Sequence, residues 1–170
     1  MSIHISRTEP GIKSYPAHAH DRWEIMTYSN GIGYLYTPEK NYPFRPGTVI
    51  LVPPHTVHGS VSENGFVNIS IGGDFENIIF SDLPIVVHDN RSSECLKLTE
   101  IIYNNRFENI GFLSKICTAY VYFLLKHIRQ SSSIARTVDK VITEITSNAL
   151  DADIKLCKIL SESGYAEDYI

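Results

Sequence analysis

The sequence predicts an α+β protein in which an all-β first half is followed by helices. Short β-prone runs punctuated by Gly, Pro and Asn fill the chain up to about Val87, and this pattern is typical of a sandwich or barrel. After Asp89 glycine nearly vanishes and apolar residues recur at helical spacing. With 170 residues, the chain is long enough for one domain and a small second module.

The first half contains three runs with the composition of strands, which are Ile25–Ser29, Gly33–Thr37 and Thr48–Val52. A tight hairpin is expected at Asn30-Gly31, because both residues tolerate positive φ. The segment Val67–Ile71 alternates aliphatic and polar residues, so Asn68 and Ser70 should share one face of a strand. In a small barrel such a polar face can line a pocket.

Helices are expected from residue 91 onward. Ser92 or Ser93 can cap a helix that runs toward Phe107, and Gly111 precedes a longer helix that ends near Gln130. The apolar stripe of the longer helix consists of Leu113, Ile116, Cys117, Tyr120, Leu124 and Ile128. Its width predicts burial against the barrel and against a second subunit, which makes these the expected dimerisation residues. Packing within one chain alone is the simpler alternative.

A polar break at residues 131–133, which are three serines, predicts a linker. Two more helical patterns follow, at about Val138–Leu150 and Asp153–Leu160, and Gly164 is a suitable C-terminal stop for the second. We therefore divide the chain into a barrel at 1–90, a helical dimerisation segment at 91–130, and a linker with further helices at 131–170.

Charge and hydropathy exclude several classes of function. The net charge is −4, and residues 131–170 hold four Lys/Arg against seven Asp/Glu, so strong DNA binding by this chain alone is not expected. No apolar stretch approaches the roughly 20 residues that cross a bilayer, and the N-terminus lacks a signal-peptide core, which predicts a cytoplasmic protein without a membrane partner. The odd, scattered cysteines, Cys95, Cys117 and Cys157, indicate reduced thiols.

A cluster of metal-binding residue types marks the predicted barrel. His18 and His20 are followed by Glu24, and His58 ends a second run that begins at Gly47. Side chains two apart in a strand share a face, so the first three residues can point into one interior. Three imidazoles and one carboxylate suit Zn, Fe(II), Ni or Mn. They could equally form a metal-free lining that hydrogen-bonds a small effector, or a satisfied polar core.

Other residues could complete an effector pocket. Four aromatic side chains could supply flat walls for an effector, and they are Trp23, Tyr28, Tyr34 and Tyr36. Asn68 could supply a polar contact. Each aromatic residue taken singly is as well explained by core packing. No nucleophile–base pair, phosphate loop or Rossmann fingerprint occurs, so we do not expect an enzyme, and any catalysis would depend on a metal.

The two runs resemble the two signature motifs of the cupin superfamily. The first carries His-x-His and a downstream Glu between glycines, and the second carries Gly, Pro and a last His. The resemblance implies a cupin barrel in which the metal-ligand positions are occupied by His18, His20, Glu24 and His58. Two departures are His55, where a glycine is common, and Ser62, where an asparagine is common.

The order of barrel, helices, polar break and further helices resembles the AraC/XylS family of transcription regulators. Val138–Ile145 and Asp153–Tyr169 are similar to the start of that family's DNA-binding domain. The resemblance implies an effector-sensing homodimer whose longer parent binds DNA. Because the recognition helix is cut short and a second helix-turn-helix is absent, we expect a fragment that does not read DNA. The alternative is a small cupin metalloenzyme using the His/His/Glu/His centre.

Overall fold

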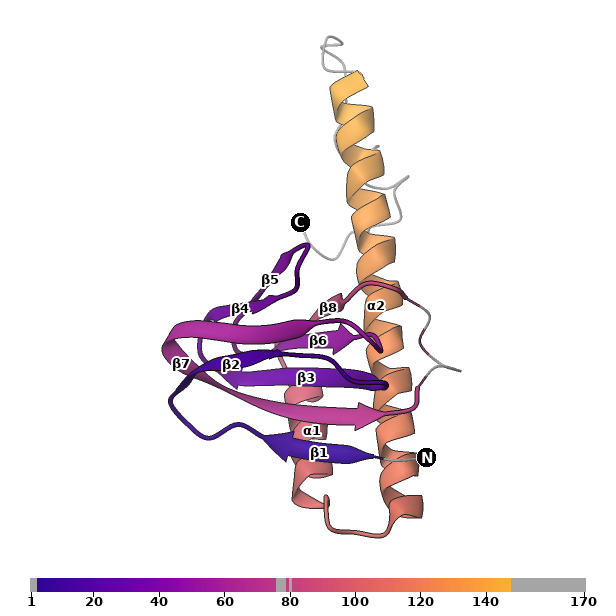
Figure 1. Cartoon of the computed structure of the whole chain (residues 1–170). Helices are drawn as coiled ribbons and strands as arrows, with labels where there is room; N and C mark the ends of the chain where they lie inside the picture. Colours follow the sequence, from indigo (N-terminus) through magenta and orange to yellow (C-terminus); the bar gives the residue numbers. More distant parts are fainter. Residues whose placement is uncertain (1–2, 76–78, 80, 148–170) are drawn as a thin grey trace. The chain divides into compact units, whose positions relative to one another are not determined.

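The computed structural model describes residues 3–75, 79 and 81–147, and the side chains among them up to residue 128 (Figure 1). In chain order the described elements are β1 His4–Arg7, β2 Ile12–His18, β3 Trp23–Asn30, β4 Gly33–Tyr36, β5 Asn41–Phe44, β6 Thr48–Val52, β7 His58–Gly73, β8 Ile85–His88, α1 Glu94–Asn104 and α2 Ile110–Ser147. Residues 1–124 form one compact unit and residues 125–170 a second. The barrel and α1 thus share one unit, with no division at residue 90.

The long strand β7 holds the barrel together because it pairs with four other strands. Its first half pairs with β2 and β4, and its second half pairs with β1 and β3. The sheet order is β5-β4-β7-β3-β6-β8, and all described pairs are antiparallel. Figure 1 shows the strands rolled into a nearly closed barrel that is followed by helices. The predicted α+β class is confirmed.

The strand register decides which side chains face the barrel interior. Met26 of β3 lies opposite Ser70 of β7, and Tyr28 lies opposite Asn68. The alternation expected for residues 67–71 is therefore confirmed, with Asn68 and Ser70 on the interior face and Ile69 on the other. Because successive side chains point to opposite faces of a strand, β3 and β7 each present one face to the interior and one to the helices.

One end of the barrel interior is filled by an apolar core. Its buried members are Met26, Tyr28, Leu35, Tyr42, Phe44, Ile50, Val52 and Phe66. The rings of Tyr28 and Phe44 are stacked, with centroids 3.8 Å apart. The hairpin between β3 and β4 turns at Gly31, whose φ of 90° confirms the turn expected there. A Cβ at this glycine would lie 2.3 Å from the Gly65 carbonyl oxygen, so no larger residue fits.

Both helices pack on the outer face of β3 through a buried cluster of hydroxyl groups. Thr27 of β3 lies 3.0 Å from Thr99 of α1 and 3.2 Å from Tyr120 of α2, measured between hydroxyl oxygens. The Thr99 and Tyr120 hydroxyls are 2.8 Å apart. Every hydroxyl in this buried contact has a partner, as burial of a polar group requires.

The predicted dimerisation stripe is largely used within the chain itself. Leu113, Cys117, Tyr120 and Leu124 are buried in the single chain. These four side chains therefore pack within the chain, and the role of the stripe in dimerisation stays a prediction. Ile116 and Ile128 are half-buried.

The start of α1 differs from the prediction. Ser93 stands at the N-cap position but has a φ of 53° and makes no side-chain capping bond. Asp89 caps the helix instead, because its carboxylate accepts hydrogen bonds of 2.9 Å from the backbone N–H groups of Cys95 and Leu96. An ionised side chain at this end also interacts favourably with the helix dipole.

The predicted break at residues 131–133 is wrong, because α2 continues through it to Ser147. Serine costs a helix only about 0.5 kcal/mol per residue relative to alanine, and neither Gly nor Pro accompanies the three serines. The linker therefore does not begin at 131. The patterns expected after residue 147, including Asp153–Tyr169, lie outside the described residues.

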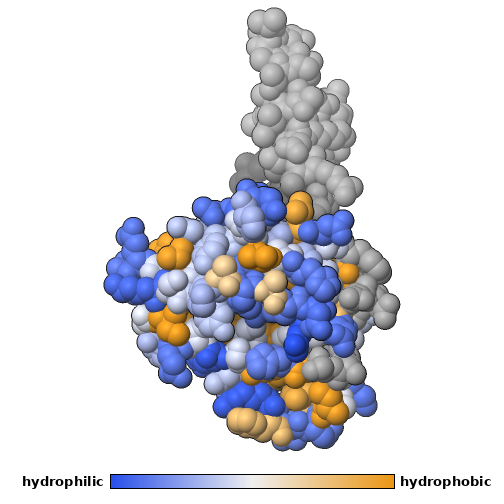
Figure 2. Space-filling model, in the orientation of Figure 1, coloured by the Kyte–Doolittle hydropathy of each residue, from blue (hydrophilic) through white to orange (hydrophobic). Residues whose placement is uncertain are grey.

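An exposed apolar patch lies around the connection between α1 and α2. Its residues are Ile101, Phe107, Ile110 and Phe112, of which Phe107 is 86% exposed. Figure 2 shows hydrophobic residues gathered at the lower end of the molecule, where this connection lies. Among the described residues, no helix is both long and apolar enough to span a membrane.

Candidate functional site

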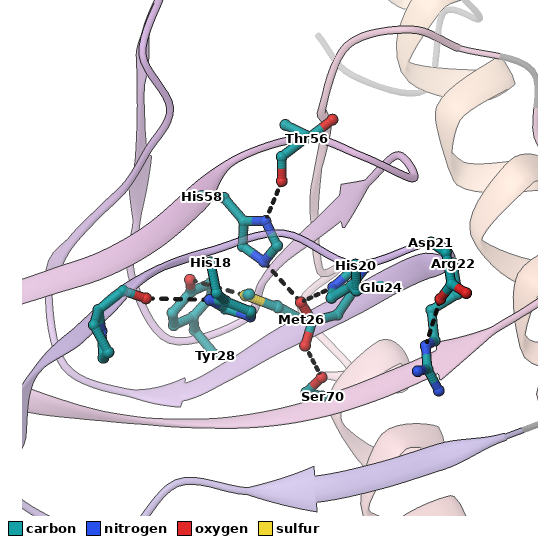
Figure 3. A network of polar contacts seen from close by, with 11 residues as sticks. His18, His20, Asp21, Arg22, Glu24, Met26, Tyr28, Thr56, His58 and Ser70 are labelled. Carbon is teal, nitrogen blue, oxygen red and sulfur yellow. Dashed lines mark hydrogen bonds and ion pairs between the residues drawn. The ribbon is translucent and has the colours of Figure 1, made fainter.

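Four predicted ligand residues meet inside the barrel (Figure 3). His18 ends β2, Glu24 lies in β3 and His58 begins β7, where it stands opposite His18 in the strand register. His20 lies in the connection between β2 and β3 rather than in a strand, so the shared-face argument did not apply to it. One ligand atom from each residue lies within 4.8 Å of all the others.

The turn at His55 brings two of these segments together. His55 has a φ of 63°, the left-handed conformation that a glycine adopts most easily. Its backbone N–H donates a 2.7 Å hydrogen bond to the carbonyl oxygen of His20. The departure from the usual glycine therefore keeps the turn geometry and ties the loop of His20 to the segment that leads into His58.

Glu24 is the centre of the cluster. Its Oε2 lies 2.9 Å from Nε2 of His20 and 2.8 Å from Nε2 of His58. Its Oε1 accepts a hydrogen bond from the Ser70 hydroxyl. Burial by itself raises the pKa of Glu24, but hydrogen bonds from His20, His58 and Ser70 outweigh burial and hold that pKa far below its usual range. The carboxylate is therefore ionised at neutral pH.

The protonation of the histidines follows from their other contacts. Nδ1 of His18 lies 3.1 Å from the Pro16 carbonyl oxygen, and Nδ1 of His58 lies 2.8 Å from the Thr56 carbonyl oxygen. A carbonyl oxygen only accepts, so both Nδ1 atoms carry a proton, and Nε2 of His58 donates to Glu24 when it too carries a proton and presents a lone pair when it does not. His20 differs, because its hydrogen bond with Glu24 raises its pKa against the opposing effect of burial.

These contacts fit a divalent metal ion. In its neutral form His58 presents an Nε2 lone pair to a carboxylate oxygen, and two acceptors at that distance require a proton or a cation between them. Nδ1 of His20 is buried and has no hydrogen-bond partner among the described residues. Carbonyl groups that accept the outer N–H of an imidazole are also the usual second shell of histidine metal ligands. The four residues form a cluster that could bind a metal.

Two cavities adjoin the cluster. One, of about 220 Å³, extends along the barrel and is lined by Ser6, Arg7, Thr8, Glu9, Ile12, Tyr15, His18, Glu24, Met26, Gly59, Ser60, Asn68 and Ser70. The other, of about 260 Å³, is lined by His4, Ser6, Tyr15, His18, His20, Arg22, Glu24, Ser70 and Gly72. Because His18, Glu24 and Ser70 belong to both walls, the cluster faces both cavities.

The predicted aromatic walls lie elsewhere. Tyr28 belongs to the apolar core, where its hydroxyl contacts Ser60 at 2.7 Å. Tyr34 and Tyr36 flank the inward-facing Leu35 on β4, so they lie on the opposite face of that strand and line neither of the two cavities. Trp23 lines a separate cleft of about 930 Å³ together with the β6–β7 connection. Of these predicted contacts, Asn68 alone lines the cavity beside the cluster.

Sequence reasoning missed the small hydroxyl residues of the cavity. Ser60 and Ser70 both line it, and the alternation of residues 67–71 had already placed Ser70 on the polar face. Ser60 follows His58 by two positions in one strand, which was an available signal. Thr8 lies between β1 and β2, and Tyr15 lies in β2. The sequence around them does not show the alternation of apolar and polar residues that marks a strand.

Comparison with known proteins agrees with this geometry. Residues 3–74 match the family model described as the AraC-like ligand binding domain. They contain every residue that lines the 220 Å³ cavity and all four residues of the cluster. The barrel thus has the cupin fold that its motifs indicated. No curated protein matches the sequence.

Several solved structures are similar to this chain. An apo variant of ToxT from Vibrio cholerae has a TM-score of 0.54 at 9% identity, and the alignment covers 96% of this chain and 70% of that chain. A cupin superfamily protein from Desulfitobacterium hafniense has a TM-score of 0.37 at 17% identity, with 42% and 65% covered. A Cupin 2 conserved barrel domain protein from Salinispora arenicola has a TM-score of 0.36 at 26% identity, with 42% and 61% covered. The last two alignments thus span less than two thirds of either cupin protein.

Proposed function

We propose that this chain is the effector-sensing and dimerisation portion of an AraC-type transcription regulator. The observation that carries the proposal is the cavity of about 220 Å³ beside the histidines, because all of its lining residues lie within the part of the chain that matches the AraC-like ligand binding domain. Its wall combines hydroxyl and amide groups with Ile12 and Met26, the mixture typical of a small-molecule pocket. The bound effector is a small molecule, and the chain is not an enzyme.

Sensing requires that the pocket and the helices communicate. Strand β3 supplies Glu24 and Met26 to the pocket. Thr27, the next residue of the same strand, points to the other face and forms hydrogen bonds with both helices. An effector that favours one position of β3 would therefore favour one position of the helices. Such a shift needs different contacts between effector and protein in the two states.

A homodimer and a DNA-binding parent belong to the same proposal. Since the buried stripe of α2 is used within the chain, a second subunit would have to contact other residues of that helix, such as Ile116 and the 60% exposed Tyr122. Light scattering should show that Tyr122→Glu yields monomer, whereas Lys13→Glu, at an exposed position of β2, does not. A dimer that survives Tyr122→Glu would exclude this face.

The second candidate is a cupin metalloenzyme, which is favoured by the fit of the four clustered residues to a divalent metal. A bound metal would supply a Lewis acid at the cluster. Elemental analysis of the purified protein beside His58→Ala tests for it: stoichiometric metal that is lost in the variant supports a metal site. Metal-free protein of normal stability would remove the enzyme hypothesis and leave a metal-free effector pocket.

A thermal-shift screen tests sensing itself. Sugars, aromatic acids and small organic anions should be tried on the full chain, and at least one class should raise the melting temperature, since a ligand that binds only the folded state stabilises it. Asn68→Asp, which adds a charge to the cavity wall, should abolish the shift, whereas Tyr34→Phe on the outer face of β4 should leave it unchanged. Absence of any stabilising ligand would contradict the proposal.

A further inference from the structure

The cluster is placed so that a metal there would face the 220 Å³ cavity of the barrel. His18 and Glu24 belong both to the four clustered residues and to the wall of the 220 Å³ cavity. Four protein ligands leave open positions on a six-coordinate divalent ion. A ligand that occupies the cavity would therefore lie next to those positions.

The volume of the cavity limits the size of the ligand. Liquid water occupies about 30 Å³ per molecule, so about 220 Å³ holds roughly seven waters or a ligand of about seven to ten non-hydrogen atoms. At the far end, Asn68 and Ser60 line the wall, and the Ser60 hydroxyl shares a hydrogen bond of 2.7 Å with the Tyr28 hydroxyl, in which either oxygen can be the donor. Two polar side chains at that end suit a second oxygen-bearing group on the ligand.

The charges around the cavity depend on the metal. Glu24 and Glu9 both line the wall, and the arginine there, Arg7, already lies 3.5 Å from Glu100. Without a metal an anionic ligand would meet the Glu24 carboxylate, which repels it. A divalent cation held by one carboxylate and three neutral imidazoles makes the centre net positive, and partial burial strengthens its attraction for an anion.

We propose that the effector is a small hydroxy- or keto-carboxylate that chelates a divalent metal at His18, His20, Glu24 and His58 and extends toward Ser60 and Asn68. This inference rests on the proposed sensing function and makes sensing metal-dependent. Metal and effector then bind cooperatively, and by thermodynamic linkage each raises the affinity for the other by the same factor.

Calorimetric titration of the full chain tests the proposal with Ni²⁺ and malate as probes. Ni²⁺ alone is titrated first, and malate is then titrated into the Ni²⁺-loaded and the metal-free protein. We expect malate to bind the loaded protein at least tenfold more tightly than the metal-free protein. Succinate, which lacks the chelating hydroxyl, should bind the loaded protein more weakly than malate does.

A matched pair of serine variants tests the far end of the cavity. Ser60→Ala should weaken malate binding about three- to tenfold, the value of one hydrogen bond, without changing Ni²⁺ affinity. Ser62→Ala is the control, because Ser62 is equally buried two residues further along β7 but bonds to Ile32 and Gly65 and does not line the cavity.

The outcomes separate this inference from the proposed function. Equal malate affinity with and without Ni²⁺ overturns chelation, and so does protein that fails to bind Ni²⁺ or that binds Ni²⁺ but not malate. Stabilisation of the metal-free protein by a neutral polyol such as xylitol, with no effect of malate, would also overturn chelation while leaving effector sensing in place.

Discussion

The hydroxyl cluster of Thr27, Thr99 and Tyr120 predicts a measurable cost for Tyr120→Phe. Each hydroxyl carries one hydrogen, and Thr99 is placed to donate its own to the Cys95 carbonyl oxygen at 2.8 Å. Tyr120 can then donate to Thr27, and Thr27 to Thr99. Loss of the Tyr120 hydroxyl removes up to two hydrogen bonds but leaves Thr27 bonded to Thr99.

The magnitude follows from this count. A net hydrogen bond contributes about 0.5–1.5 kcal/mol, and no buried donor is left unpaired, so Tyr120→Phe should lower the free energy of unfolding by about 1 kcal/mol. Urea unfolding should show a lower midpoint with an unchanged slope. Tyr122→Phe, at a 60% exposed position two residues away, is the matched control and should change nothing.

A double-mutant cycle with Thr27→Val isolates the contact between strand and helix. The two residues share partners, so the double variant should be less destabilised than the sum of the single ones by about 0.5–1 kcal/mol. Additive costs, or a Tyr120→Phe variant as stable as the control, would show that the cluster does not hold the helices on the barrel.

Two further predictions compare variants at matched positions. Gly31→Ala should lower the free energy of unfolding by well over 2 kcal/mol, because the new Cβ would clash with the Gly65 carbonyl oxygen. Gly11→Ala, at a glycine with a similar positive φ but no atom within 4 Å, should lower it by about 1 kcal/mol. Chemical unfolding measures both variants, and equal losses of stability would contradict the clash. Asp89→Ala should lower stability by about 1–2 kcal/mol through loss of the α1 cap, while Ser93→Ala should be neutral by circular dichroism melts; the reverse order would restore the serine as the cap.

The metal-type cluster and part of the barrel could be predicted because their signals are local. The apolar β-branched run Thr48–Val52 became β6 with the same bounds, and the alternation around Asn68 gave the correct interior face. The spacing of His18 and Glu24 indicated a shared site even though the argument from a single strand failed for His20.

The errors occurred where the sequence signal was not unique. An aromatic residue in a strand looks the same whether it packs in a core, as Tyr28 does, or lines a pocket, and only the register with β7 decides between them. The cap of α1 came from Asp89, several residues before the helix, through a bend that local capping rules do not describe. The three serines before Ile134 interrupt the apolar pattern of the sequence, but the helical backbone of α2 continues through them.

The alternation of β3 has a consequence for how this protein can change over evolution. Glu24 and Met26 face the pocket, whereas Thr27 faces the helices, so the two sets of side chains can be substituted almost independently. Ligand preference can therefore diverge at the pocket positions while the helix contacts keep their geometry. In the proposed sensor, a change of effector would therefore need no change in the contacts between β3 and the helices.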